Sequence, residues 1–532
     1  MNIKRCHLKS ATRTTKNHSP YLHQNNGFSH TAYSMTLSTD LIAWSTLSVG
    51  EIPHSLVVEN KTLHHLKSVR SIPRRRLVLH GVWQEVEVYA KFFLGLDAKK
   101  YAQRDKCGRD LLQQAHIATP TLLYAGAVAE DVEVLIFQAV ASSINTQEAY
   151  RLATDQAARR DLVMRLVQTV AQHHKTGLLQ TDLHLKNFLV ITDRPIIYTL
   201  DGDGICAISP WLKKSQQLHN LATLFSKMDV LDDIWIAYLY QTYCKEMGVE
   251  YYVENASQVR GLTQKIRRQV ASAYADKKVF RTCSDVKVIR SFKYFIAIAN
   301  DFLVERPLLL SLDQFLTDKS KNIKNGNTCT IAQAGMAGLH VVVKRYNIKN
   351  LWHGLSRAVR PSRAAKSWAN AHRLRISNIT TAKPLALVEE RFGYFRHRAY
   401  YISEYIDAPD VMQFFAQSVR LEDRQTVAHN LATLFYKLYL LKFSHGDCKA
   451  SNIKIVNFAP VLIDLDGMQA HFGSVVGDWW FERKHIKDLK RLMKNWENDA
   501  EVTILLKRAL LSEYIAQRPD EGKHILFRAA IV

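Results

Sequence analysis

The chain has 532 residues, 47% hydrophobic and 23% charged, and this composition excludes a disordered polypeptide. Its net charge of +23 favours a polyanionic partner, such as nucleic acid, an anionic membrane face or an acidic substrate, although a solvated lysine-rich surface gives the same balance. The seven cysteines are scattered without a C-x-x-C pair, which argues against a disulfide framework or structural zinc and favours a reducing compartment.

The first 34 residues are basic, contain no acidic residue and are rich in Ser, Thr, Asn and His. They hold no apolar stretch of the about 7–15 residues that a secretory signal needs. The sequence therefore predicts a disordered basic tail over residues 1–34. No apolar run approaches the about 18 residues of a membrane-spanning helix, so none is expected.

From about residue 70 to about 310 the sequence alternates between strand and helix patterns. Alternating apolar residues from Val78 to Phe93 predict two strands around a turn at Gly81, and a polar segment from Leu96 to Gln114 predicts a helix. Further along we expect, in order, a strand near 121–124, a strand at 132–140, a helix at 157–175 and a strand at 195–200. Helices are then expected up to about residue 305.

A second series of elements in the same order begins near Lys324. It comprises strands on both sides of a turn at Gly335 to Gly338, a helix with Trp368, strands at 384–388 and 400–406, a long helix at 425–441 and a strand at 459–465. This order predicts an internal duplication with a long period. The expected domains are residues 35–310 and 311–532.

Each half carries the pattern Asp-x-x-x-x-Asn, followed by a further Asp after an apolar strand. The last Asp lies 19 residues past the first in one half and 17 in the other. This spacing is typical of a kinase catalytic loop followed by its metal-binding Asp. The sets are Asp182, Asn187 and Asp201 in the first half, and Asp447, Asn452 and Asp464 in the second.

Phosphoryl transfer explains these residue types. A carboxylate must orient the attacking hydroxyl and accept its proton, and Asp182 and Asp447 suit that role. Magnesium prefers hard oxygen ligands, which the Asn and the later Asp of each half can supply. The predicted metal ligands are Asn187 with Asp201, and Asn452 with Asp464. Asp203 and Asp466, two residues further on, offer another carboxylate.

A kinase also needs a cation on the phosphates, carried by a strand that precedes the loop. Lys91 and Lys344 fit, lying 91 and 103 residues before the predicted bases. Asp105 is the best candidate for the helix acid that holds Lys91, with Asp110 as the weaker one. The second half offers no obvious helix acid.

Two further residues complete the predicted sites. Neither half has a G-x-G-x-x-G motif, but Gly326 begins a turn whose amides and hydroxyls could face phosphate. Lys449, two residues after the second predicted base, could steady the transferred phosphoryl group.

Each of these features also has a purely structural explanation. A single Asp-x-x-x-x-Asn arises by chance, a strand lysine can lie along an edge, and an Asp after a strand can cap a turn. The complete order is harder to produce twice by chance. The sequence therefore predicts an α+β protein with two tandem bilobal protein-kinase-like domains.

These motifs resemble the bacterial lipopolysaccharide kinase family, the Kdo and heptose kinases. The resemblance covers roughly residues 70–300 and 320–500. It rests on Asp182-Leu-His-Leu-Lys-Asn-Phe-Leu in the first half, and on Lys344-Arg-Tyr-Asn, Ser362-Arg-Ala, Trp368, Pro384-Leu-Ala and Ser403-Glu-Tyr in the second.

The resemblance implies ATP with Mg²⁺ and, as acceptor, a heptose or Kdo hydroxyl of the lipopolysaccharide core or a lipid A-core precursor. It also implies a cytoplasmic protein, peripheral at the anionic inner face of the inner membrane, where basic residues would steer and hold the substrate.

Two alternatives stay open at the level of sequence. Ser444-His-Gly-Asp also resembles the loop of aminoglycoside and choline kinases, so the acceptor could be a protein or a small molecule. One or both halves could instead form a tandem pseudokinase scaffold without activity. Nucleic acid is not expected as a partner, because no basic and aromatic residues interleave.

Overall fold

The computed structural model describes residues 40–46, 55–191, 194–320, 322–347, 360–472, 475–517 and 519–531. The predicted tail over residues 1–34 lies outside these ranges. The chain divides into two compact units. The first comprises Met1–Ser143 with Tyr198–Asp203, and the second comprises Ile144–Ile197 with Gly204–Val532. No helix in the described ranges is both long and apolar enough to cross a bilayer.

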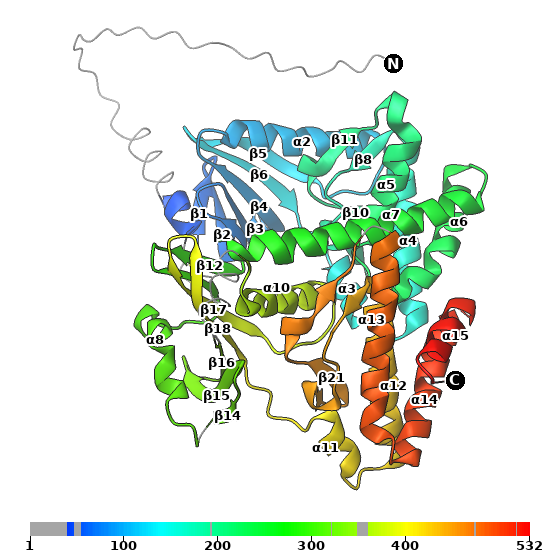
Figure 1. Ribbon diagram of the computed structural model, residues 1–532. Coiled ribbons are helices and arrows are strands. Elements are labelled where there is room, and N and C mark those ends of the chain that lie inside the picture. Colours follow the sequence, from blue (N-terminus) through cyan, green and yellow to red (C-terminus); the bar gives the residue numbers. More distant parts are fainter. Residues whose placement is uncertain are drawn as a thin grey trace. The chain divides into compact units, whose positions relative to one another are not determined.

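The first unit is built on a six-stranded antiparallel sheet with the order β1-β2-β3-β4-β6-β5 (Figure 1). Its elements are β1 (Ser55–Val58), β2 (Lys61–Ile72), β3 (Arg76–Trp83), β4 (Val86–Leu94), α2 (Ala98–Gln114), β5 (Leu122–Ala129) and β6 (Val132–Gln138). Val88 and Phe92 of β4 belong to the core of one sheet face, whereas Phe93 packs with Ala98 and Ala102 of α2 on the other. Because side chains alternate along a strand, Lys91 shares the face of Phe93, towards α2.

The predicted turn at Gly81 is wrong. Gly81 lies within β3, opposite Val88 of β4. The chain turns instead at Gln84 and Glu85, whose φ angles of 51° and 64° give the two-residue hairpin turn that fits twisted strands. Gly81 is required by packing, because a Cβ there would lie 2.6 Å from the carbonyl oxygen of His64 on β2.

The second unit begins with a helical region. Its helices are α3 (Thr146–Leu152), α4 (Gln156–Lys175), α5 (Lys213–Phe225), α6 (Ile236–Met247) and α7 (Val253–Ser272). The short strands β8 (Leu178–Gln180), β9 (Phe188–Ile191) and β11 (Ile205–Ala207) belong to this unit, and β8 pairs with β11. The strands β7 (Ser143–Asn145) and β10 (Ile197–Thr199) each include residues of both units. Val163 and Val167 of α4 pack with Leu221 and Phe225 of α5 in one core, which fixes the loop that follows α4.

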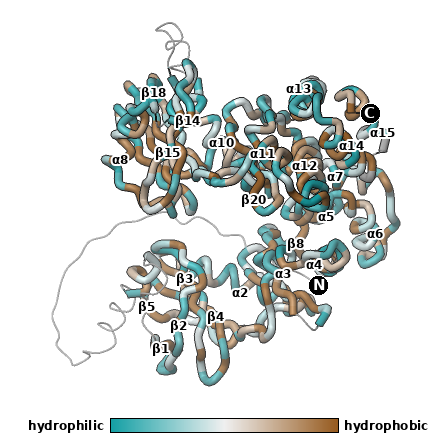
Figure 2. The backbone as a smooth tube through the Cα atoms, turned by 90° about the horizontal axis from the view of Figure 1, so that it is seen from below, coloured by the Kyte–Doolittle hydropathy of each residue, from teal (hydrophilic) through white to brown (hydrophobic). Residues whose placement is uncertain are grey.

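A seven-stranded antiparallel sheet follows, with the order β12-β13-β17-β18-β16-β15-β14. Its strands are β12 (Val286–Arg290), β13 (Tyr294–Ala299), β14 (Asn322–Asn325), β15 (Cys329–Met336), β16 (Leu339–Tyr346), β17 (Pro384–Phe392) and β18 (Phe395–Glu404). Helices α8 (Arg306–Leu310) and α10 (Arg363–Ile376) belong to the same region, and hydrophobic segments run along the strands (Figure 2).

The expectation of helices up to residue 305 is wrong for β12 and β13. Phe295 and Ala297 of β13 belong to one core, and Ile296 and Ile298 belong to another, so both faces of this strand are buried. An uninterrupted apolar run of this kind lacks the alternation that distinguishes a strand from a helix. The domain boundary at 310/311 stays a prediction, and the pairing of β13 with β17 favours an earlier boundary.

The remainder of the second unit is again mainly helical. Its helices are α11 (Val411–Ala416), α12 (Leu421–Leu441), α13 (Val475–Met493), α14 (Ala500–Gln517) and α15 (Pro519–Arg528). Two strand pairs, β19 (Phe443–Ser444) with β22 (Gln469–Ala470) and β20 (Ile453–Val456) with β21 (Ala459–Leu462), frame the second acidic loop. The fully buried side chains in one core include Phe435 of α12, Phe481 of α13 and Tyr514 of α14. Cys448 and Ala450 of the loop belong to the same core, so the three helices support the loop.

Candidate active site

In the first unit the predicted lysine and helix acid meet. Lys91 Nζ lies 3.0 Å from Asp105 Oδ2 and 3.4 Å from Asp201 Oδ1. The other carboxylate oxygen of Asp105 accepts a hydrogen bond of 3.1 Å from the amide of Gly202. Asp110, the weaker candidate, pairs with the adjacent Arg109 instead.

Close backbone packing fixes this arrangement. A Cβ on Gly108 of α2 would lie 1.9 Å from the carbonyl oxygen of Gly202, and a Cβ on Gly202 would lie 2.1 Å from that of Asp105. Both positions therefore need glycine. The contact presses α2 onto the chain that follows Asp201, so Asp105 and Asp201 reach the same amine.

Sequence reasoning missed an arginine at this site. Arg76 at the start of β3 lies 3.8 Å from Asp201 and 3.5 Å from Asp203, and Arg104 of α2 lies 2.8 Å from Asp203. Burial would raise the pKa of Asp201, but Lys91 and Arg76 outweigh it and lower that pKa. Burial would likewise lower the pKa of Lys91, but the charges of Asp105 and Asp201 raise it.

The loop of the first predicted base belongs to the second unit. Asn187 Nδ2 donates to the main-chain oxygen of Asp182 at 2.9 Å and to its carboxylate at 3.3 Å. The amide of His184 also donates to the main-chain oxygen of Asp182, at 2.7 Å. Because Asn187 uses its NH₂ group in this way, its Oδ1 is the atom that could serve as a metal ligand.

The second half brings its lysine to two carboxylates. Lys344 Nζ lies 2.5 Å from Asp464 Oδ1 and 3.4 Å from Asp466 Oδ2, and only 9% of its side chain is exposed. Burial would lower the pKa of Lys344, but the negative charges around it raise it. Burial would raise the pKa of Asp464, but Lys344 lowers it. Both groups are therefore charged at neutral pH.

In the second half, an asparagine of α10 stands at the position that Asp105 has in α2. Asp105 is the eighth residue of α2, and the eighth residue of α10 is Asn370. Asn370 Nδ2 donates to the carbonyl oxygens of Leu465 at 2.9 Å and Met468 at 3.0 Å. The amide thus anchors α10 to the chain after Asp464, as Asp105 does after Asp201, but it supplies no charge to Lys344.

Residues 273–280 hold α10 from its other side. Arg373 of α10 donates to Asn370 Oδ1 and to Asp276, which lies in a single π-helical turn at Ala273–Lys277. Trp368 Nε1 donates to the carbonyl oxygen of Val279 at 3.1 Å. Single π turns frequently occur at functional sites. A chain of hydrogen bonds therefore runs from Asp276 through Arg373 and Asn370 to the segment that carries Asp464 and Asp466.

Changing Asp276 to Ala is expected to loosen this anchor. Arg373 is buried and would lose its carboxylate partner, but Asp276 is half exposed, so we expect a loss of about 1 kcal/mol in the free energy of unfolding. Calorimetry should show a lower Tm for Asp276→Ala than for Lys277→Ala, an exposed residue in the same turn. Equal Tm values for the two variants would show that the contact of Asp276 with Arg373 does not stabilise α10.

The second acidic loop has the same hydrogen bonds between Asn and Asp as the first. Asn452 Nδ2 donates to the main-chain oxygen of Asp447 at 2.8 Å and to its carboxylate at 3.4 Å. Lys449 Nζ lies 3.6 Å from Asp447 Oδ2. Arg491 of α13, which sequence reasoning missed, lies 2.6 Å from Asp447 Oδ1. Two cations thus face the predicted base.

A second missed residue, Asp488, holds this loop. It is buried on α13, and its carboxylate accepts hydrogen bonds from the amides of His445 at 2.7 Å and Gly446 at 3.0 Å. Burial raises the pKa of Asp488 against the lowering effect of His445 and of these amides. The sequence does contain a pattern that could have revealed Asp488. His485, Asp488 and Arg491 are spaced by three residues, which places these polar groups on one face of a helix.

The corresponding helix of the first half is different. Gln180 stands two residues before Asp182, as His445 does before Asp447, and its carbonyl oxygen accepts a hydrogen bond of 2.9 Å from Asn220 of α5. Thr223 follows Asn220 at the spacing that Arg491 has from Asp488. The first half therefore has an acidic residue on the helix after the lysine strand, Asp105, but a neutral residue, Asn220, bonded to its loop. The second half has a neutral residue on that helix, Asn370, and an acidic residue, Asp488, bonded to its loop.

The donor set fits a magnesium ion that is held jointly with a nucleotide. Asn452 and Asp464 offer hard oxygen atoms, and Mg²⁺ is commonly bound through one or two carboxylates together with substrate phosphates. Within the described ranges no three or more His, Cys, Asp or Glu side chains form a metal-binding group by themselves.

The contacts of Gly326 limit its predicted role. Its amide donates to the carbonyl oxygen of Cys329 at 3.0 Å, and its carbonyl oxygen accepts from Asn347 Nδ2 at 3.0 Å. The amide is thus used within the turn between β14 and β15, and the carbonyl oxygen is bonded to a residue directly after β16. Phosphate binding by Gly326 stays a prediction.

Comparison with known proteins points to the same chemistry. Residues 313–514 match the model of the lipopolysaccharide kinase (Kdo/WaaP) family. This range includes Lys344, Asp447, Asn452, Asp464 and Asp488, and the match supports a phosphotransferase. No curated protein matches the chain.

Among solved structures, a co-crystal structure of WbdD with the kinase inhibitor LY294002 is similar at 16% identity and a TM-score of 0.28. The match covers 40% of this chain and about half, 52%, of that chain.

Proposed function

We propose that the protein is an ATP-dependent kinase that phosphorylates a heptose or Kdo hydroxyl of the lipopolysaccharide core. The observation that carries this proposal lies within residues that match a lipopolysaccharide kinase family: Lys344 pairs with Asp464, and the amide of Ile463, next to Asp464, donates at 3.0 Å to the carbonyl oxygen of Asn452 in the Asp447–Asn452 loop. A buried amine, a carboxylate near a loop asparagine and a strand-end carboxylate are the groups that phosphoryl transfer from ATP requires.

In this proposal Asp447 orients the acceptor hydroxyl and takes its proton. Arg491 and Lys449 face Asp447 and are placed to stabilise negative charge on the transferred phosphoryl group. Lys344 binds the nucleotide phosphates, and Asn452 with Asp464 would hold Mg²⁺. The bound ion would neutralise charge on the phosphates.

We also propose that the first half of the chain forms a kinase-like domain of its own. Lys91, Asp105 and Asp201 repeat the nucleotide-binding groups, and Asp182 with Asn187 repeats the loop. The sequence alone favoured the first half as the complete site, because it has the helix acid. The family match and the contacts of Asp447 with Arg491 favour the second half for the transfer step.

The charge of the chain supports the proposed acceptor and location. A net charge of +23 suits a lipid-linked acceptor that carries carboxylates and phosphates. We propose that the protein works at the cytoplasmic side of the inner membrane, bound peripherally to its anionic surface. This binding is expected to weaken as the salt concentration rises.

Transfer of radiolabel from γ-labelled ATP tests the proposal. With Mg²⁺ present, we expect label in a lipopolysaccharide that lacks core phosphates and none after chelation with EDTA. A basic protein, choline and an aminoglycoside serve as competing acceptors. Label in one of these instead would identify a different kinase. No label in any acceptor, with MgATP still bound, would identify a pseudokinase scaffold.

A further inference from the structure

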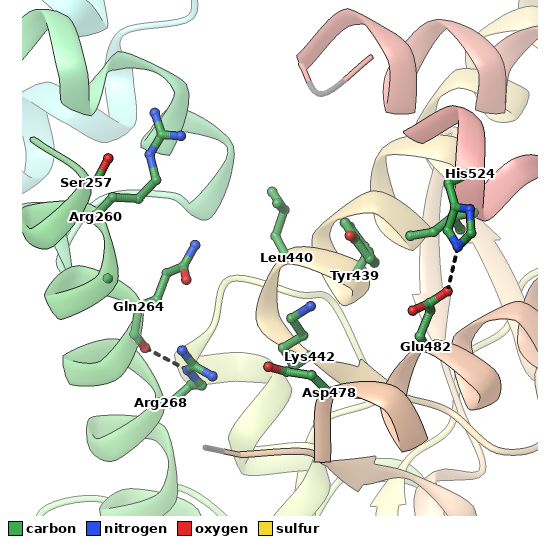
Figure 3. Close-up of a pocket in the computed structure, with 12 residues that line it drawn as sticks. Ser257, Arg260, Gln264, Arg268, Tyr439, Leu440, Lys442, Asp478, Glu482 and His524 are labelled. Atoms are coloured by element: carbon green, nitrogen blue, oxygen red, sulfur yellow. Dashed lines mark hydrogen bonds and ion pairs between the residues drawn. The ribbon is translucent and has the colours of Figure 1, made fainter. Parts of the chain in front are cut away.

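A cavity of about 530 Å³ lies within the second unit, and no residue of the acidic loops is among those that line it. One wall is α7, which presents Arg260, Gln264 and Arg268 at intervals of four residues and hence on one face. Lys442 at the end of α12 and Asp478 of α13 lie across the opening (Figure 3). The cavity is therefore bounded by elements from both halves of the sequence.

Two of the three arginines of α7, Arg260 and Arg268, line the cavity and have no acidic partner among the described residues, whereas Arg267 pairs with Asp233. Arg260 makes no hydrogen bond or ion pair with any residue that the structure describes. Arg268 donates from Nε to the carbonyl oxygen of Gln264 in its own helix, at 3.1 Å, and no carboxylate of a described residue pairs with its guanidinium. Both side chains are half-buried. Guanidinium groups without a carboxylate partner keep N–H donors that an anion can accept, so the wall of α7 is suited to an anion.

The opposite wall is more balanced in charge. Glu482 pairs with Arg528 and with His524 at 3.4 Å, and not with Arg260 or Arg268. The ammonium group of Lys442 lies 4.9 Å from the ring centres of Tyr439 and Phe481. Asp478 and the amide of Gln264 remain as polar groups that can bind hydroxyls.

We propose that this cavity binds a sugar that carries a phosphate or carboxylate group. Arg260 and Arg268 would bind the anionic group, whereas Asp478 and Gln264 would bind sugar hydroxyls. The volume lies within the range of about 300–1,000 Å³ that is usual for small-molecule sites. This inference rests on the proposed function, because the acceptor would use the cavity as an anchoring site for a second acidic sugar.

The position of the cavity supports that role. Lys442 ends α12, three residues before the loop that begins at His445. Asp478 and Asp488 lie on the same helix, ten residues or about 15 Å apart. The elements that would bind the anchoring sugar are thus the elements that hold the catalytic loop, and an extended acidic saccharide could contact both.

Calorimetric titration of the full chain with glucose 6-phosphate, without nucleotide, tests the proposal. Changing Arg260 and Arg268 together to Gln should weaken binding at least about tenfold, because two charge-assisted contacts are lost. Lys265→Gln, an exposed cation of α7 outside the cavity, should leave binding unchanged. Glucose and inorganic phosphate should each bind more weakly than glucose 6-phosphate.

Several outcomes would overturn the anchoring site. The first is that the double variant and the unchanged chain bind glucose 6-phosphate with equal affinity. The second is that Lys265→Gln loses as much affinity as the double variant. The third is that inorganic phosphate binds as tightly as glucose 6-phosphate. A loss of MgATP affinity in the double variant would show a nucleotide site instead. If lipopolysaccharide accepts no label but the double variant still loses glucose 6-phosphate binding, the proposed function fails while the sugar site stands.

Discussion

Changing Asp447 to Asn is expected to lower the rate of phosphoryl transfer about 10²–10⁴-fold, the usual contribution of a general base. The amide has nearly the same size and can still lie beside Asn452 and Lys449, but it cannot accept the proton of the acceptor hydroxyl. The rate of label transfer to lipopolysaccharide at saturating ATP measures the effect. MgATP binding, followed by thermal shift, should be retained, because Asp447 is not among the groups around Lys344.

The matched variant in the first half is Asp182→Asn. If the second half carries the transfer step, this variant keeps most of the activity, and the double variant behaves like Asp447→Asn alone. Loss of activity in Asp182→Asn with little loss in Asp447→Asn would place the reaction in the first half, as the sequence alone favoured. Unchanged core phosphate in both single variants and in the double variant, counted by mass spectrometry, would reject the enzymatic function.

Changing Asp488 to Ala is expected to cost roughly 2–5 kcal/mol in the free energy of unfolding and to reduce transfer strongly. The carboxylate accepts hydrogen bonds from two amides in a buried position, and alanine would leave the amides of His445 and Gly446 without this acceptor. The loop that carries Asp447 would then lose its fixed position. Urea unfolding and the rate of label transfer measure the two effects.

Two variants on the same helix separate these causes. Asp488→Asn retains one oxygen acceptor and should lose less stability than Asp488→Ala. Lys487→Ala changes an exposed neighbour and should alter neither quantity. If Asp488→Ala is as stable and as active as Lys487→Ala, Asp488 does not hold the loop.

Local chemistry made part of the site predictable. The Asp and Asn of each loop are five residues apart, so one turn of chain brings them together, as Asn187 and Asn452 show. The alternation of β4 likewise directs Lys91 towards the helix that follows it, where Asp105 lies.

The two wrong predictions, the turn at Gly81 and the helix over β13, have the same kind of physical cause. Gly81 was assigned to a turn because glycine is common there, whereas it is needed for close approach to His64. The apolar run of β13 gave no alternation, because both of its faces are buried. In both cases the deciding contact lies on another strand.

By itself the sequence determined the residue types, their spacing within each loop, the order of elements and the charge. These depend on neighbours along the chain. Only the tertiary structure decided which distant groups meet: Arg76 with Asp201, Asn370 with the chain after Asp464, and Asp488 and Arg491 with a loop about 40 residues earlier. Hydrogen bonds and ion pairs act over a few ångströms in space, so a partner on another helix leaves no regular spacing in the sequence.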